Sequence, residues 1–166
     1  MKILFAILIF LLIGVSCQTK QINQLTKQEL EVYKSILGEK PKEIVVIDES
    51  RVGVFGEIST GGLKKILTGL QSDTFENFVK MNATQTEIND KVRSSFDYPL
   101  IIRKDFEEKN IGHYVFSRVG FSKDGKQAVV MFMDIRNPLG MKGAYFLLEN
   151  KNGIWEITQE SESWKS

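Results

Sequence analysis

The sequence has little of the side-chain chemistry on which many enzymes and metal proteins depend, since its 166 residues include one cysteine and one histidine. A single cysteine leaves no pair for an internal disulfide. One histidine excludes the zinc motifs that need two. A Ser–His–acid triad would have to use His113, which we expect in solvent at the start of a strand, and no Gly-x-Ser-x-Gly motif supplies a nucleophile. The sequence therefore predicts no catalytic residue, no metal site and no cofactor.

The sequence also lacks an excess of either charge, with 22 Lys plus Arg against 21 Asp plus Glu. Lys2 is the only charged residue among the first 16, so the chain after residue 16 is balanced. Nucleic acids and anionic membrane surfaces attract proteins through clustered basic residues. The composition therefore argues against a nucleic-acid partner and against a polybasic membrane patch.

The apolar run near the start is too short for a typical membrane span, which needs about 20 residues. Ile3–Val15 holds 13 residues after the positive Lys2, the size of the central region of a secretory signal peptide. The run ends at Gly14-Val15-Ser16-Cys17, which looks like the lipobox at which bacterial lipoproteins are cut, although Gly14 stands where Leu is usual. We predict a lipoprotein signal peptide over residues 1–16 and lipid attachment at Cys17. This prediction has two alternatives: an ordinary signal peptide followed by a chance cysteine, and an uncleaved anchor helix.

A lipid on Cys17 would hold the rest of the chain at a membrane of the cell envelope. Residues 17–25 form a short tether, and the polar stretch Gln18–Gln24 spans on the order of 15 Å when flexible. Residues 26–166 have the size of one ordinary domain. We therefore predict a single domain close to the bilayer, on a periplasmic or surface face. The outer membrane is one candidate, and the sequence leaves the choice of membrane open.

A helix over residues 27–37 is the clearest local prediction. Thr26 and Glu29 form the sequence pattern of a capping box, in which each side chain bonds the backbone of the other residue. Leu25 and Leu30 frame that pattern as a hydrophobic staple. Gly38 is placed to end the helix.

The rest of the chain predicts mainly strands. A β-branched run at Ile44–Ile47 indicates a buried strand, and the C-terminal third predicts hairpins that turn at Asp124-Gly125 and Asn152-Gly153. The strands expected there are Tyr114–Phe121, Gln127–Ile135, Ala144–Glu149 and Ile154–Thr158. The predicted fold class is α+β, with the N-terminal helix packed on an antiparallel β-meander, and a cystatin-like arrangement is one form of it.

Two stretches of the C-terminal third resemble a group of uncharacterised bacterial predicted lipoproteins. They are Phe116–Ser122, followed by Gln127–Val130, and Gly143–Glu149, followed by Asn152-Gly153-Ile154-Trp155. The resemblance covers about 45 residues, and implies the meander and the envelope location. That group has no known active site, so it implies no functional residue.

One loop stands out as a candidate binding site. The segment from Arg136 to Lys142 has more residues than a tight hairpin needs, and it offers two apolar side chains between two basic ones. The alternative is that the apolar pair packs back into the core. The residues of this candidate binding loop are Arg136, Leu139, Met141 and Lys142.

These observations favour a membrane-anchored envelope lipoprotein that acts as a non-enzymatic binding module, with a protein partner at the envelope. A small envelope hydrolase is the first alternative, since Asp105, Glu107, Glu108 and Asp134 supply carboxylates, and paired carboxylates can drive glycoside hydrolysis. That chemistry needs two acids at a set separation, which the sequence does not show. An inhibitor or immunity-type protein is the second alternative.

Overall fold

The structure is a computed structural model that describes residues 22–48, 60–106, 112–136 and 142–165. Cys17 and the predicted signal peptide lie outside the described residues. In chain order, the helices and strands are β1 (Ile22–Gln24), α1 (Lys27–Leu37), β2 (Ile44–Ile47), α2 (Thr60–Ile66), α3 (Ser72–Asn82), β3 (Gln85–Glu87), α4 (Asp90–Arg93), β4 (Leu100–Ile102), a 3₁₀ turn (Arg103–Asp105), β5 (His113–Phe116), β6 (Gly120–Phe121), β7 (Gln127–Asp134), β8 (Lys142–Lys151) and β9 (Ile154–Lys165).

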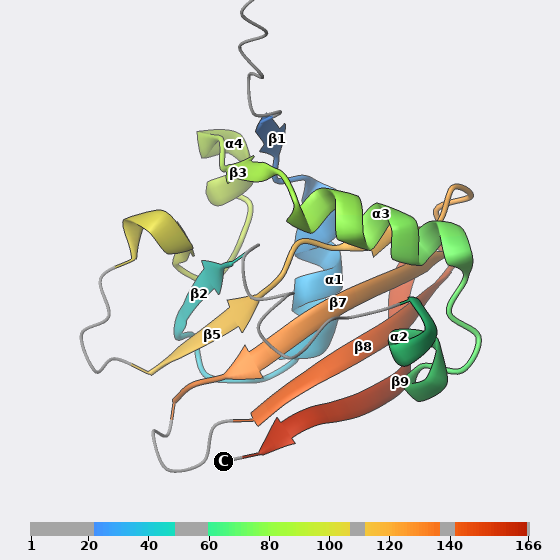
Figure 1. The fold of residues 1–166 in the computed structure, drawn as a ribbon. Helices are drawn as coiled ribbons and strands as arrows, with labels where there is room; N and C mark the ends of the chain where they lie inside the picture. The colour runs from blue at the N-terminus through green and yellow to red at the C-terminus, as the bar shows by residue number, and fades with distance from the viewer. Residues whose placement is uncertain (1–21, 49–59, 107–111, 137–141, 166) are drawn as a thin grey trace, which may run out of the picture.

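One large sheet forms the centre of the molecule (Figure 1). Within the described chain its strands follow the order β4-β2-β5-β7-β8-β9, and β6 also pairs with β7. The pairs from β5 to β9 are antiparallel, whereas β2 runs parallel to both β4 and β5. The predicted α+β class, with a mainly antiparallel sheet, is confirmed.

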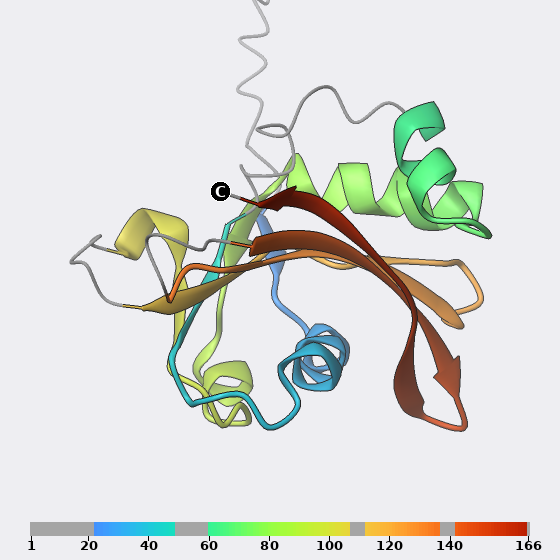
Figure 2. The ribbon, with the colours of Figure 1, turned by 90° about the horizontal axis from the view of Figure 1, so that it is seen from below.

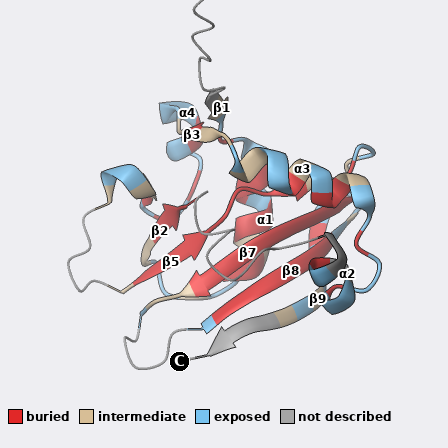
Figure 3. Ribbon diagram, viewed as in Figure 1, coloured by how far each residue is buried: buried red, intermediate tan, exposed pale blue. Residues whose placement is uncertain are grey.

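Helices lie on both sides of this sheet (Figure 2). The helix α1 covers one face, and α2 and α3 lie over the other. Two separate hydrophobic clusters result, because successive side chains of a strand point to opposite faces. Along β7, for example, Val130 belongs to the α1 side and Val129 to the α3 side, and both are fully buried. The strand β7 is therefore buried on both faces, as its place in the middle of the sheet requires (Figure 3).

The capping box fixes α1 as predicted. The Glu29 backbone N–H donates to Thr26 Oγ1 at 3.2 Å, and the Thr26 N–H donates to Glu29 Oε2 at 2.9 Å. The helix begins at Lys27 and Gly38 caps its end, with a φ of 51°. The strand predicted at Ile44–Ile47 is confirmed with the same bounds.

The prediction of a single strand over Tyr114–Phe121 is wrong for the middle of that segment. The ladder breaks between Phe116 and Gly120, where three residues face only two residues of β7, as in a β-bulge. The break turns Arg118 into the interior, where its side chain is fully buried. A regular strand would have left this side chain on a sheet face that hydrophobic residues occupy.

The described residues begin inside the segment expected as a tether, 17–25. Residues Ile22–Gln24 form β1, which runs parallel to β3, and Leu25 is buried. The Leu25 N–H donates to the Glu87 carbonyl at 2.8 Å. The chain is therefore bound to the domain before the capping box of α1. Figure 1 shows β1, β3 and α4 gathered at one end of the molecule.

Candidate functional site

The candidate binding loop is only partly described, because Leu139 and Met141 lie outside the described residues. At its start, Arg136 binds the Asp134 carboxylate with two bonds, of 2.8 Å from Nε and 2.7 Å from Nη2. The Arg136 guanidinium also lies 5.2 Å from the centre of the Tyr114 ring. Burial acts to raise the pKa of Asp134, but the hydrogen bonds from Arg136 outweigh it and leave that pKa below its usual value. Through these contacts Arg136 stabilises the end of β7.

At the other end of the loop, Lys142 is exposed and lies opposite Asp134 in the β7–β8 ladder. It borders a hollow of about 330 Å³ on the α1 side of the sheet. Phe132 and Phe146 form part of the lining, and Lys40 and Glu160 contribute charged groups. The structure thus brings one predicted residue, Lys142, to a hollow that Arg136 does not line.

His113 lies in the interior, and the expectation that it is in solvent is wrong. Its side chain is 3% exposed, and its ring lies 4.6 Å from that of Phe106. Burial follows from its place in β5, which is covered on one side by β2 and on the other by β7.

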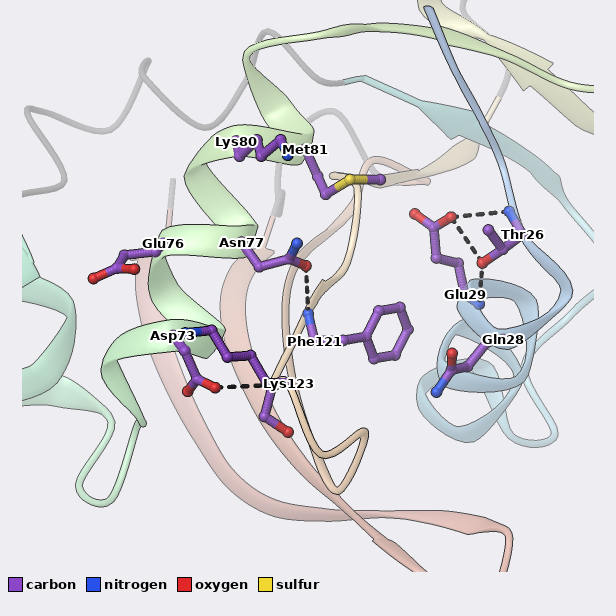
Figure 4. Close-up of a pocket in the computed structure, with 11 residues that line it drawn as sticks. Thr26, Gln28, Glu29, Asp73, Glu76, Asn77, Lys80, Met81, Phe121 and Lys123 are labelled. Carbon is purple, nitrogen blue, oxygen red and sulfur yellow. Dashed lines mark hydrogen bonds between the residues drawn. The ribbon is translucent and has the colours of Figure 1, made fainter.

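A larger hollow of about 460 Å³ lies between α1, α3 and the β6 hairpin, and sequence reasoning did not find it (Figure 4). We call it the α1–α3 groove. The side chain of Phe121 lies in its middle, between residues of α3 and the first turn of α1. Its lining residues are Thr26, Gln28, Glu29, Asp73, Glu76, Asn77, Lys80, Met81, Phe121, Ser122 and Lys123.

The inner wall of the groove rests on a buried ion pair between Glu29 and Arg118, both fully buried. Arg118 Nε donates to Glu29 Oε1 at 2.7 Å and Nη2 donates to Oε2 at 3.0 Å. The other guanidinium hydrogens reach the Asn23 and Gln24 carbonyls and Thr86 Oγ1 at 3.0–3.1 Å. All five donors of the guanidinium are therefore used, which a buried arginine needs in order to be tolerated.

A buried tyrosine continues this network towards the sheet. The Tyr33 hydroxyl donates to the Ser117 carbonyl at 2.9 Å, and its ring lies 4.4 Å from that of Phe116. Burial, aided by the nearby negative charge of Glu29, raises the pKa of Tyr33 well above its usual value. Tyr33 therefore stays a neutral donor at physiological pH.

The helix α3 binds the segment that leads into and out of β6 through three side chains. Asn82, Asn77 and Asp73 accept the backbone N–H groups of Arg118, Phe121 and Lys123 at 2.8, 2.8 and 2.9 Å. The helix thus takes the place of a neighbouring strand along this edge. Gly120 lies so close to the helix that a Cβ there would come 2.5 Å from Phe78 Cα.

The acids deep in the groove are engaged in the fold. Both oxygens of Glu29 accept hydrogen bonds, from Arg118 and from Thr26. Both oxygens of Asp73 also accept, from the backbone N–H groups of Thr74 and Lys123. These carboxylates are therefore structural acceptors for neighbouring donors.

The outer polar groups, by contrast, face the groove without bonds to the described chain. They are the Gln28 amide, the Asn77 Nδ2 group and the ammonium groups of Lys80 and Lys123, whereas the Glu76 carboxylate at the edge points away from Phe121 (Figure 4). Gln28, Glu76, Lys80 and Lys123 are exposed. The groove combines an aromatic ring at its base with a ring of available donors and acceptors. Such a combination is typical of ligand sites.

No family model matches the chain, and no curated protein or solved structure shows significant similarity to it. The resemblance of the C-terminal third to predicted lipoproteins therefore stays a prediction. Among the described residues, no helix is both long and apolar enough to cross a membrane. The same part of the chain contains no group of three or more histidine, cysteine or acidic side chains able to hold a metal ion.

Proposed function

We propose that this protein is a lipid-anchored binding module of the cell envelope, and that the α1–α3 groove is its binding site. The observation that carries the second part is the pairing of the Phe121 ring with the Gln28 amide and the Asn77 Nδ2 group beside it, neither of which is bonded to the described chain. A hollow of about 460 Å³ lies within the range of small-molecule sites.

The position of β1 supports the link between anchor and groove. Four residues lie between Cys17 and Ile22, and the five steps from one Cα to the next span at most about 17 Å when fully extended. The first turn of α1, which lines the groove, follows β1 directly. A lipid on Cys17 would therefore hold the groove close to the bilayer surface.

The finer description of the fold, a helix on a meander with a cystatin-like arrangement, belongs to this proposal. It is supported by α1, whose residues Leu30 and Tyr33 share a core with Phe132 and Phe146 of the antiparallel strands. The parallel pairs that β2 forms with β4 and β5 are additions to such a meander.

The hydrolase alternative needs two carboxylates that are free to face one substrate. In the groove, Glu29 and Asp73 are already occupied by donors of the fold, which leaves Glu76 as the available acid. The binding module is therefore the better supported proposal. An inhibitor or immunity-type protein would be a binding module whose ligand is an enzyme or toxin.

The anchor is tested by replacing Cys17 with alanine. We expect the Cys17→Ala protein to remain an uncut precursor without lipid, because the thiol is the acceptor of the lipid. Mass spectrometry and fractionation of the wild type should show a lipid-modified N-terminal cysteine in the membrane fraction. A variant that matures and fractionates as the wild type does would overturn the anchor.

The groove is tested by capture from envelope extract with two matched variants. We expect the Gln28→Ala/Lys80→Ala protein to lose a ligand that the wild type retains, by roughly tenfold or more, because it removes two groups of the groove rim. Both side chains are exposed and unbonded in the described chain, so the fold should be unaffected.

The control for this experiment changes the exposed N-cap of α4 and one exposed residue within α4, both outside the groove lining, as Asn89→Asp/Lys91→Ala. Aspartate keeps the acceptor that caps α4, so the control should fold and bind as the wild type does. Equal retention of ligand by both variants, or no retained ligand at all, would contradict the assignment of the groove.

A further inference from the structure

The wall of the α1–α3 groove formed by β6 offers no main-chain N–H at the positions where a peptide would pair. The Phe121 and Lys123 N–H groups are bonded to Asn77 and Asp73. An extended peptide that adds to a sheet depends on such groups being free. Side chains must therefore make the contacts by which this groove recognises a ligand.

The base of the groove is an apolar platform. The Phe121 ring is half-buried, and Met81 lines the groove beside it. Behind Phe121 lies Trp155, whose ring is 5.5 Å away and which is itself buried. The Phe121 ring is thus supported from the core while one side of it borders the hollow (Figure 4).

The charges around this platform balance. Asp73 and Glu76 are acidic, Lys80 and Lys123 are basic, and the charge of Glu29 is met by Arg118. A ligand with a strong net charge would find no opposite excess here. The Asn77 and Gln28 amides add both donors and acceptors, so the rim suits groups that donate and accept at once.

From these features we infer that the groove binds a sugar ring of a neutral oligosaccharide; this rests on the groove being the binding site proposed above. A sugar ring has an apolar face of C–H groups that can lie on the Phe121 ring. Hydroxyls around its edge are both donors and acceptors, and match the mixed rim of Gln28, Asn77 and Lys80. Side chains alone supply these contacts.

The experiment titrates the ¹⁵N-labelled protein with two neutral probes, the trimer of N-acetylglucosamine and maltotriose. The protein is isolated from whichever cell fraction holds it, in dodecylphosphocholine, because a sugar-based detergent would compete. We expect at least one trisaccharide to shift the amide signals of Phe121, Asn77 and Gln28 and to saturate. The peptide N-acetyl-Gly-Phe-Gly-amide and citrate should leave these signals unchanged.

The sharpest variant is Asn77→Asp. It keeps an acceptor for the Phe121 N–H and removes the Nδ2 donor, so the fold contact remains while one ligand contact is lost. We expect about fivefold weaker binding of the trisaccharide. Asn89→Asp makes the same chemical change while keeping its capping acceptor on α4, outside the groove lining, and should bind as the wild type does. Phe121→Leu, which removes the platform, should weaken binding at least tenfold.

The outcomes separate this inference from the proposed function. If neither trisaccharide binds at millimolar concentration, or if binding survives both Asn77→Asp and Phe121→Leu, the inference is wrong. If the peptide or citrate shifts the groove signals and the sugars do not, the inference is wrong while the groove remains a binding site. If envelope extract yields no groove-dependent ligand and no probe binds, both fail together.

Discussion

Replacing Arg118 with methionine is expected to lower the free energy of unfolding by about 3–5 kcal/mol. The substitution would leave the Glu29 carboxylate buried beside Thr26 and Val119 without its counter-charge. It would also remove the donors that hold the Asn23 and Gln24 carbonyls. Because domains of this size are stable by about 5–15 kcal/mol, the loss is a large fraction of the whole. Urea denaturation should show the midpoint falling by about 2 M.

A double variant separates the buried charge from the packing of the arginine. Glu29→Gln keeps the capping box, since glutamine also serves at that position, and removes the negative charge. We expect Glu29→Gln/Arg118→Met to be more stable than Arg118→Met alone, so that the two changes are not additive. An Arg118→Met protein within about 1 kcal/mol of the wild type would show that the ion pair does not hold this end of the fold.

Gly120→Ala is the second substitution with a large expected effect. The added Cβ would lie 2.4 Å from Phe78 Cβ and 2.6 Å from Phe78 N, so α3 would have to move away from β6. That movement would stretch the bonds from Asn77 and Asn82 to the β6 segment. We expect a loss of about 2–3 kcal/mol, at the upper end of overpacking effects, measured by thermal or urea unfolding.

The control for this prediction is Gly125→Asn in the hairpin turn between β6 and β7. Gly125 has a φ of 69° and open space around its Cβ position, and asparagine adopts such a conformation more readily than other residues do. The control should stay within about 1 kcal/mol of the wild type. If Gly120→Ala is as mild as the control, α3 does not lie as tightly on β6 as the structure shows.

The parts of the fold that the sequence predicted are those with local causes. The capping box joins Thr26 and Glu29, which are three residues apart. The strand at Ile44–Ile47 is indicated by its run of β-branched residues. The break at Arg118 has a distant cause, because its partner Glu29 lies 89 residues away in the chain. Nothing near Arg118 in the sequence points to this distant partner.

The candidate sites show the same division between features with local causes and features with distant ones. The loop from Arg136 to Lys142 was found from its length and composition, and the structure brings Lys142 to a hollow. The α1–α3 groove was missed because its residues come from three separate segments of the chain. One signal was present: Asp73 and Asn77 are four residues apart, at helical spacing, beside the buried Phe78, which indicates polar contacts on an inward face of α3.

The bonds from Arg118 to the Asn23 and Gln24 carbonyls also determine how the domain would bear mechanical load. A pull applied to the chain before Ile22, as from an anchor in a moving membrane, would act along β1. Because β1 is paired with β3 along its length and held by Arg118, the load would stretch several bonds at once rather than peel them apart singly. The force would then pass through Glu29 into α1, so the most buried ion pair among the described residues would also hold β1 in place.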